Sequence, residues 1–248
     1  MRAIILAAGY GRRLGREAPK CLLEFDGVTL LERHLRLLRA AGVDEIVIAV
    51  GYQPQQIEQA VASLGWQPPP QYLHNERYQL GSVLTAQVCA PALRAGGDVL
   101  LMDADVLYDQ RMLAALTAGE HADRLLQDRG YTPGDEPVKL CTKNGRPVEL
   151  RKRVADGLDY DAVGESVGFF RFSEDSAARF ADIVQRYVDD GRADQPHEEA
   201  VRDLLLERPQ VFETVDVTGL PWLEIDFPAD VLRATEQVLP QLRPLPEM

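Results

Sequence analysis

The chain has 248 residues, 27 basic and 39 acidic, with a formal net charge of −12. A chain of this length can form one large α/β core without disulfides or metal ions to stabilise it. The excess of acidic residues argues against nucleic acids and anionic membranes as general partners. The apolar runs fall far short of the ~20 residues that span a bilayer. We expect no membrane insertion, no signal peptide and, because Cys21, Cys89 and Cys141 are widely spaced, reduced thiols in the cytoplasm.

Strand and helix patterns alternate through the first half of the chain. Continuous apolar runs predict buried strands, and apolar residues at helical spacing predict helices, the first of them capped by Thr29 and stopped by Gly42. The predicted strands are 2–7, 45–50, 71–74 and 98–102, and the predicted helices are 29–41, 54–64, 81–95 and 109–118. This alternation is typical of βαβ units, so we expect a Rossmann-like, mostly parallel sheet with helices on both faces.

The second half of the chain has a different pattern. Short alternating segments separated by turn residues predict a small antiparallel addition to the sheet, with strands at 124–127, 138–142, 148–151 and 166–172. Helices are predicted at 174–191, 197–207 and 228–242, with extended segments at 211–217 and 222–226. We expect a single domain over residues 1–248, with a nucleotide-binding half (1–120), an acceptor-binding half (121–227) and a C-terminal helix and tail (228–248).

A glycine-rich loop covers residues 9–20 and follows the first strand. Ligands of parallel sheets bind at the carboxyl ends of strands, and small residues and glycines let backbone N–H groups approach a ligand. Arg13 and Lys20 are suited to neutralising phosphate charge, and the first twenty residues contain five basic side chains and one acidic one. The loop is neither a Walker A motif nor GxGxxG, because position 14 is Leu. A plain turn with two surface arginines is the alternative.

Two acidic features end strand-like segments. Asp103 and Asp105 follow the apolar run 98–102, and strand alternation places both on one side. Asp226 ends the segment 222–226 immediately before a predicted helix. Carboxylates without imidazoles suit Mg²⁺, which commonly binds one or two of them together with substrate phosphates. The alternatives are ordinary strand-end turns and, for Asp226, an N-cap of the following helix.

The run LAAGYGRRL, followed by Pro19-Lys20, resembles the signature of nucleotidylyltransferases that activate phosphorylated metabolites with an NTP. The similarity spans nearly the whole chain and is closest to short CTP-dependent cytidylyltransferases of the phosphocholine, phosphonate and inositol-phosphate type. It implies that Asp105 and Asp226 hold the catalytic Mg²⁺, with Asp103 and Glu224 as second choices. It also implies a set of nucleotide-binding residues: Leu6, Ala7, Ala8, Gly9, Gly11, Arg12, Gly81 and Ser82.

The implied reaction transfers CMP from CTP to a small phosphorylated or phosphonate acceptor, similar to phosphocholine, and releases pyrophosphate. Arg13 would hold the β- and γ-phosphates, and Lys20 would neutralise the acceptor or the α-phosphate. Because the attacking phosphate oxygen is already anionic, no general base is needed, and catalysis rests on positioning and charge neutralisation.

The acceptor candidates are Asn75, Lys139, Glu165, Glu198 and Trp222. Each has an ordinary alternative, such as a structural turn for Asn75, a surface lysine for Lys139 and solvated glutamates. Trp222 and Glu198 would suit a cationic acceptor. Two other functions stay open: a sugar-1-phosphate nucleotidylyltransferase that uses UTP or dTTP, and a nucleotide-binding regulator without catalysis.

Overall fold

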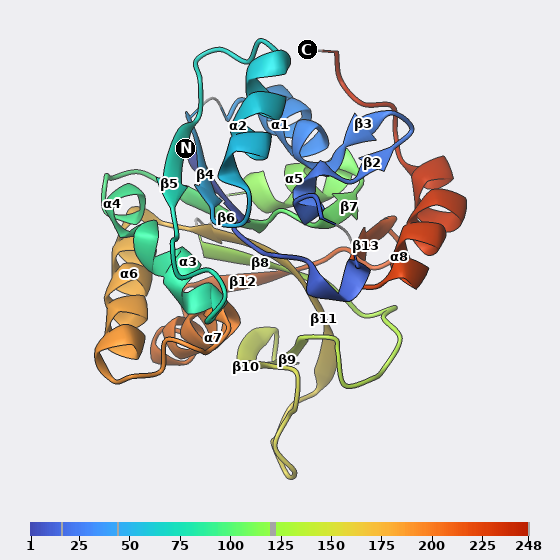
Figure 1. Ribbon diagram of the computed structural model, residues 1–248. Coiled ribbons are helices and arrows are strands. Elements are labelled where there is room, and N and C mark those ends of the chain that lie inside the picture. The colour runs from blue at the N-terminus through green and yellow to red at the C-terminus, as the bar shows by residue number, and fades with distance from the viewer. Residues whose placement is uncertain (16, 44, 120–122, 248) are drawn as a thin grey trace.

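A computed structural model describes residues 1–15, 17–43, 45–119 and 123–247 (Figure 1). A nine-stranded sheet runs through it in the order β10-β9-β11-β6-β1-β4-β5, with β8 beside β11 and β12 beside β8. The nine strands are β1 (Arg2–Ala7), β4 (Glu45–Val50), β5 (Gln71–His74), β6 (Val99–Asp103), β8 (Asp123–Asp128), β9 (Lys139–Lys143), β10 (Arg146–Arg151), β11 (Ala162–Phe172) and β12 (Phe212–Asp216).

The first-half strands β6, β1, β4 and β5 are parallel, and β11 pairs antiparallel with β6, β8 and β9. The predicted fold class, a mixed Rossmann-like sheet with an antiparallel addition in the second half, is therefore confirmed. Both halves of the chain belong to this one sheet, because β11 lies directly beside β6.

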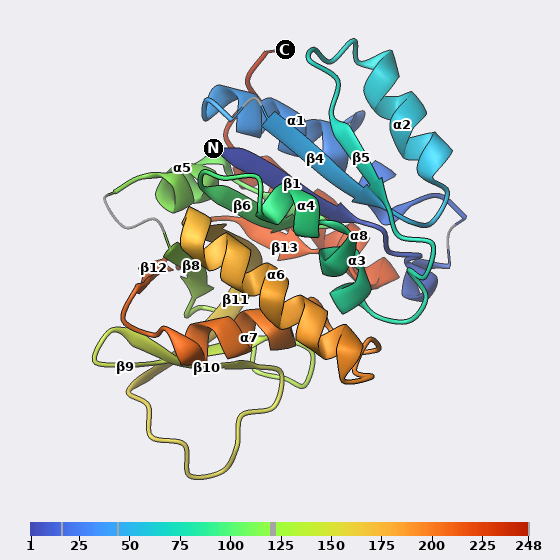
Figure 2. The same cartoon turned by 90° about the vertical axis from the view of Figure 1, so that its left-hand side faces the viewer.

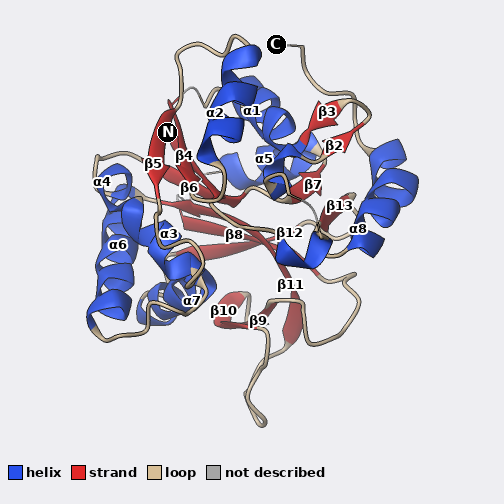
Figure 3. Ribbon diagram, viewed as in Figure 1, coloured by secondary structure: helices blue, strands red, loops and turns tan. Residues whose placement is uncertain are grey.

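Helices cover both faces of the sheet, as Figures 2 and 3 show. Ile5 and Ile48 point to the face packed by α1, α2 and α5, whereas Ile4 and Val47 point to the face packed by α3, α4, α6 and α7. Full burial of each such side chain contributes about 1.5–3 kcal/mol. The helices are α1 (Leu30–Ala40), α2 (Pro54–Ser63), α3 (Ser82–Val88), α4 (Ala90–Leu93), α5 (Gln110–Thr117), α6 (Glu174–Asp189), α7 (His197–Glu207) and α8 (Pro228–Arg233).

The ends of α1 match their sequence signals. The Thr29 hydroxyl accepts a hydrogen bond from the backbone N–H of Glu32 at 3.1 Å, which is an N-cap. Gly42 follows the helix with φ +74°, the left-handed conformation in which glycine commonly ends a helix. Local side-chain and backbone chemistry therefore sets both boundaries.

Two of the predicted helices are interrupted. The segment 81–95 divides at Cys89 into α3 and α4, because Pro91 lacks the N–H that a continuous helix requires. The closing segment 228–242 is α-helical over α8, then forms a π turn at Ala234–Val238 and a 3₁₀ turn at Leu239–Gln241, where Pro240 prevents α-helical continuation.

Two small antiparallel pairs lie beside the main sheet. The hairpin β2 (Glu24–Phe25) and β3 (Val28–Thr29) was not predicted, although Asp26 and Gly27 form a turn with positive φ. The other pair joins β7 (Val106–Tyr108) to β13 (Trp222–Glu224), which brings the end of the chain next to the loop after β6.

Two further predictions concern membranes and thiols. Within the described residues, no helix is long and apolar enough to cross a membrane. Cys21, Cys89 and Cys141 are free and buried. Burial raises the pKa of the Cys21 thiol and of the Cys89 thiol to about 12, so both are protonated at neutral pH.

Candidate active site

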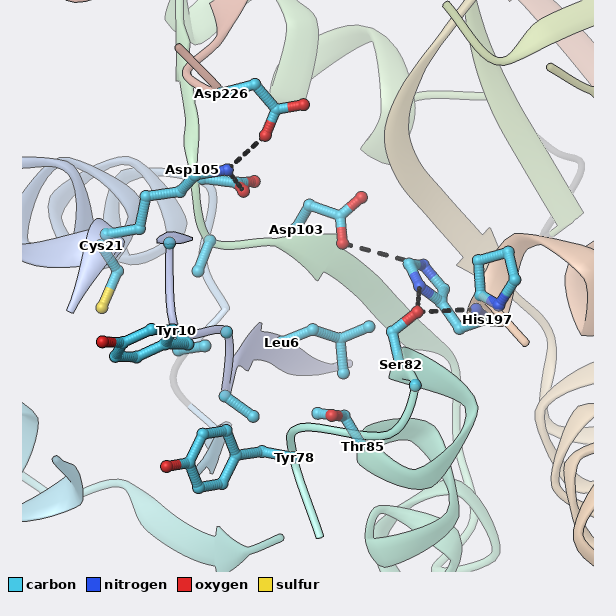
Figure 4. A pocket seen from close by; sticks show the side chains of 18 of the residues that line it. Leu6, Tyr10, Cys21, Tyr78, Ser82, Thr85, Asp103, Asp105, His197 and Asp226 are labelled. Atoms are coloured by element: carbon cyan, nitrogen blue, oxygen red, sulfur yellow. Dashed lines mark hydrogen bonds and ion pairs between the residues drawn. The ribbon is translucent and has the colours of Figure 1, made fainter. Parts of the chain in front are cut away.

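A cavity of about 530 Å³ opens at the carboxyl ends of β1 and β6, the edge where parallel sheets bind ligands. One wall is the first loop, another is the segment leading into α3, and a third is the start of α7. Figure 4 shows Asp103 between the Asp105–Asp226 group on one side and Ser82 and His197 on the other. Residues from both halves of the chain therefore converge on one space.

Lys20 lies at the centre of the acidic group. Its Nζ is 2.6 Å from Oδ2 of Asp105 and 2.6 Å from Oδ1 of Asp226. Burial by itself would lower the pKa of Lys20, but the two carboxylates outweigh it and raise this pKa above its ordinary value. The ammonium group is therefore charged and is held by two carboxylates that are far apart in sequence.

The two carboxylates reach Lys20 from different elements. β6 ends at Asp103, so Asp105 lies in the following turn, and the expected strand alternation does not apply to it. Asp226 follows β13, and its backbone N–H donates to Oδ2 of Asp230 at 3.1 Å. The N-cap position of α8 belongs to Phe227, whose N–H also donates to Asp230. Asp226 is thus not the cap of α8, and its side chain faces Lys20.

Asp103 faces the opposite side of the cavity from the Lys20 group. Its Oδ1 lies 3.7 Å from Nε2 of His197. Gly168, with φ +78°, leaves room for this carboxylate, because a Cβ there would lie 2.3 Å from Oδ2 of Asp103. Burial, with repulsion by Glu198 and Asp105, raises the pKa of Asp103 well above its usual range.

Asp105, Glu224 and Asp226 each have a carboxylate oxygen within 4.8 Å of the others. Glu224 is exposed at its surface, but loss of hydration among the neighbouring groups, with repulsion by the carboxylates of Asp105, Asp226 and Asp103, raises its pKa well above its usual range. An all-oxygen donor set with excess negative charge fits a hard divalent cation such as Mg²⁺. The residues present are thus compatible with the predicted metal, and Glu224 joins Asp105 and Asp226 in the group.

Arg13, predicted to hold phosphates, lies at the mouth of the same cavity. Its guanidinium contacts Oε2 of Glu136 at 3.3 Å and Oδ2 of Asp226 at 3.1 Å, and it lies over the ring of Phe227. Lys152 contacts the same Glu136 oxygen at 3.1 Å. One carboxylate therefore bridges two cations at the entrance, in an arrangement that an anionic ligand can replace.

The predicted nucleotide-binding residues gather in this cavity, with one exception. Its lining includes Leu6, Ala7, Ala8, Gly9, Gly11, Gly81 and Ser82. The side chain of Arg12 lies outside the described part of the chain. Gly81 also has a packing role, because a Cβ there would lie 2.6 Å from the backbone of Asp194. The segment before α3 is thus pressed against the segment before α7.

The predicted acceptor residues separate into three groups. Glu198 lines the first cavity, and Glu165 and Trp222 line a second one. Asn75 and Lys139 are not among the described residues that line either cavity. The Asn75 amide donates to Thr85 and accepts from the N–H of Arg77, as a structural turn would, and the Lys139 ammonium binds two backbone carbonyls.

The second cavity, of about 440 Å³, shares Glu224 and Asp226 with the first. Its lining includes the aromatic residues Tyr131, Trp222 and Phe227, together with several carboxylates. The Trp222 indole N–H donates to Oδ2 of Asp128 at 2.8 Å. Burial, with repulsion by Asp128, raises the pKa of Glu165 to about 7. Aromatic faces beside carboxylates suit an organic cation.

Several site residues were missed by the sequence analysis. Tyr78, Lys152 and His197 all line the first cavity. Their local sequences contain no motif that distinguishes them from ordinary surface or core residues, and only His197 had a neighbour, Glu198, among the candidates. Cys21 lines the cavity as well, but its protonated thiol does not suit a nucleophile.

Comparison with known proteins shows the family of this chain. A sequence model described as the MobA-like NTP transferase domain matches residues 3–155, more than half of the chain. The chain belongs to this family. As a MobA-like NTP transferase it is a nucleotidyltransferase, which confirms the assignment made from the N-terminal signature.

Relatives of this MobA-like protein include named cytidylyltransferases and a bifunctional transferase. The CTP:phosphoglutamine cytidylyltransferase of Campylobacter jejuni is 23% identical over 93% of this chain and 98% of its own length. The bifunctional IPC transferase and DIPP synthase of Rubrobacter xylanophilus is 29% identical over 96% of this chain, which spans only 52% of that longer protein.

Solved structures show the same fold. The inositol-1-phosphate CTP transferase of T. maritima superposes with a TM-score of 0.74, at 19% identity, over 98% of both chains. The CTP:phosphocholine cytidylyltransferase of Streptococcus pneumoniae gives a TM-score of 0.75 at 20% identity, over 95% of this chain and 97% of its own. Both similarities extend along nearly the full length.

Proposed function

We propose that this nucleotidyltransferase transfers CMP from CTP to a small phosphorylated or phosphonate acceptor and releases pyrophosphate. The observation that carries the proposal is the Lys20 ammonium between Asp105 and Asp226, at the base of a cavity walled by the glycine-rich loop. The choice of CTP draws support from the relatives that are named cytidylyltransferases.

The reaction brings two anionic groups together, the phosphate of the acceptor and the α-phosphate of the nucleotide. An acceptor phosphate oxygen attacks the α-phosphorus of the nucleotide, and the bond from that phosphorus to the bridging oxygen of pyrophosphate breaks. Lys20 supplies positive charge where the two phosphates approach each other, and Arg13 and Lys152 supply it where pyrophosphate leaves. Because the nucleophile is already ionised, electrostatic stabilisation and positioning account for catalysis, without a general base.

Mg²⁺ is part of the proposal. Asp105 and Asp226 would hold it, with Glu224 as a third carboxylate within reach. When bound, Mg²⁺ supplies Lewis-acid stabilisation of phosphoryl charge. Lys20, which contacts Asp105 and Asp226 in the free protein, would offer its ammonium group to a substrate phosphate.

We place the acceptor in the second cavity, which meets the first at Glu224 and Asp226. Trp222 and Tyr131 offer aromatic faces there, and Asp128 and Glu165 offer carboxylates. These groups favour an acceptor with a positively charged end, such as phosphocholine or an aminoalkylphosphonate, over a neutral one.

Transfer to a sugar 1-phosphate from UTP or dTTP is the second candidate. A protein described as a putative glucose-1-phosphate thymidylyltransferase from Bacillus anthracis has a TM-score of 0.71 over 95% of this chain, at 14% identity. That likeness concerns the fold alone. The second cavity favours the first candidate, because its described lining contains several carboxylates but one basic residue, Arg233, so a cationic group adds counter-charge that a neutral sugar does not.

A pyrophosphate-release assay tests the proposal. Four nucleotides (CTP, UTP, dTTP and GTP) are each combined with phosphocholine, 2-aminoethylphosphonate, inositol 1-phosphate and glucose 1-phosphate, with Mg²⁺ and with EDTA. We expect turnover with CTP that EDTA abolishes. Activity confined to UTP or dTTP with glucose 1-phosphate would establish the second candidate instead. Binding of CTP without pyrophosphate release from any combination would identify a non-catalytic regulator.

A further inference from the structure

His197, the first residue of α7, is 3% exposed and lines the first cavity. Its backbone N–H donates to Oγ of Ser82 at 2.8 Å, and its Nδ1 lies 3.2 Å from the same oxygen. The Ser82 hydroxyl can donate to Nδ1 or accept from it, so Nδ1 has a partner in either ring tautomer.

Nε2 of His197 is buried and has no hydrogen-bond partner among the described residues. The nearest carboxylate oxygen, Oδ1 of Asp103, lies 3.7 Å away, too far for a hydrogen bond. Figure 4 shows the imidazole and Asp103 facing each other across this part of the cavity. A buried donor or acceptor without a partner costs about 1–3 kcal/mol, so such groups usually have a partner when the protein is in its functional state.

A second unpaired atom lies beside the first. Oε2 of Glu198 is 3.1 Å from Nδ1 of His197, yet it makes no hydrogen bond within the described part of the chain. One buried ring nitrogen, Nε2, therefore stands next to two carboxylates, those of Glu198 and Asp103, and both carboxylates line the cavity.

A hydroxyl group fits this arrangement in either ring tautomer, because it can accept from a protonated Nε2 while donating to a carboxylate, or donate to an unprotonated Nε2. A phosphate oxygen only accepts, and the two carboxylates would repel it. An apolar group would leave all three side chains unpaired. We propose that His197, Glu198 and Asp103 form a binding site for a hydroxyl group of one of the two substrates.

The inference rests on the proposed function only for the identity of those substrates. The hydroxyl has two sources: the ribose of the nucleotide and a hydroxylated acceptor. The site lies beside Ser82 at the start of α3 and two residues along the chain from Asp105. This position, between the phosphate-binding end and the α3 wall, is where a ribose would connect phosphates to a base.

Two variants of His197 isolate the contribution of Nε2. His197→Asn keeps a polar atom near Ser82 but does not reach the position of Nε2, whereas His197→Gln extends an amide N–H toward it. Glu199→Gln is the matched control, because Glu199 is on the same helix but pairs with Arg151 outside the cavity. The melting transition of each variant checks that it is folded.

The nucleotide arm measures dissociation constants of CTP, 2′-deoxy-CTP and 3′-deoxy-CTP by calorimetry. If the hydroxyl belongs to ribose, the wild-type protein prefers CTP over one deoxy analogue by at least about tenfold. His197→Asn then loses this preference, while His197→Gln restores much of it and Glu199→Gln retains it. This arm needs no catalysis, so it does not depend on turnover.

The acceptor arm compares kcat/KM for inositol 1-phosphate with that for phosphocholine. If the hydroxyl belongs to the acceptor, His197→Asn leaves the preference for CTP over its deoxy analogues unchanged. It then lowers kcat/KM for inositol 1-phosphate relative to phosphocholine by about tenfold. A folded His197→Asn protein in which all ratios stay within about twofold of wild type overturns the hydroxyl site. Continued CMP transfer by the wild-type protein would then leave the proposed function intact.

Discussion

Lys20 and Asp226 are 206 positions apart in sequence, yet Nζ of one lies 2.6 Å from Oδ1 of the other. The contact joins the loop after the first strand to the segment after the last strand. It exists because β13 pairs with β7, directly after the turn that holds Asp105. Segments from early and late in the sequence therefore meet at the candidate site.

Removal of Lys20 or Asp105 should abolish catalysis without unfolding the protein. We expect Lys20→Ala and Asp105→Ala each to lower kcat by about 10²–10³-fold, the size of a lost electrostatic contact to the transition state. Pyrophosphate release measures the loss. Lys143→Ala is the control, because Lys143 is an exposed lysine that pairs with Asp159 away from both cavities. Near-normal turnover in a folded Lys20→Ala protein would contradict the assignment.

Glu165 should make the free protein less stable as pH rises. Its pKa is raised from 4.5 to about 7, so between these values the folded state binds more protons than the unfolded state, and stability falls with increasing pH. We expect Glu165→Gln to be more stable than wild type at pH 8, by about 1 kcal/mol after allowance for solvent screening. The two proteins should melt together near pH 4.5.

Glu207 serves as a control for Glu165, because its expected effect on stability changes with pH in the opposite direction. Arg179 and Arg186 lower the pKa of Glu207, so its contribution to stability is present above the unfolded pKa and is lost in acid. Glu207→Gln should therefore be less stable than wild type at pH 8. Thermal unfolding across the pH range measures both variants. Destabilisation by Glu165→Gln at pH 8 would show that its carboxylate has a partner in the folded protein.

Gly168 should tolerate substitution less well than a glycine with the same backbone conformation. Gly168 and Gly157 both have φ +78°, but only at Gly168 would a Cβ meet a neighbour, Oδ2 of Asp103 at 2.3 Å. Gly157→Ala measures the backbone strain alone, at about 1 kcal/mol. Gly168→Ala should cost at least about 1 kcal/mol more and should also lower activity, because Asp103 must move. Equal unfolding free energies would show that Asp103 moves freely.

Glu136 should compete with the nucleotide for Arg13 and Lys152. Its carboxylate contacts both cations in the free protein, so a triphosphate must displace it. We expect Glu136→Gln to lower KM for the nucleotide by about two- to fivefold, the scale of an exposed ion pair, with kcat little changed. Asp135→Asn removes the same charge one residue away and is the control. An increased KM would mean that Glu136 helps to bind the substrate.

The sequence by itself determined the parallel half of the sheet, most helices and the loop chemistry. Apolar runs and helical spacing are local, so 2–7 and 45–50 were predicted with the bounds that β1 and β4 have, and the signature after β1 identified Lys20. The break at Cys89 also has a local cause, Pro91. The apolar pattern continues on both sides of it, and for that reason the sequence predicted one continuous helix.

The tertiary structure decided which side chains share a space. Glu224 joins Asp105 and Asp226 because β13 pairs with β7, and His197 faces Asp103 because α7 packs its first turn against Ser82. Such contacts depend on strand pairing and helix packing between distant segments, and no local pattern records them. The excess of acidic residues does not by itself predict a cation site. Loss of hydration and mutual repulsion among a few carboxylates that share one space make this cavity suited to a cation.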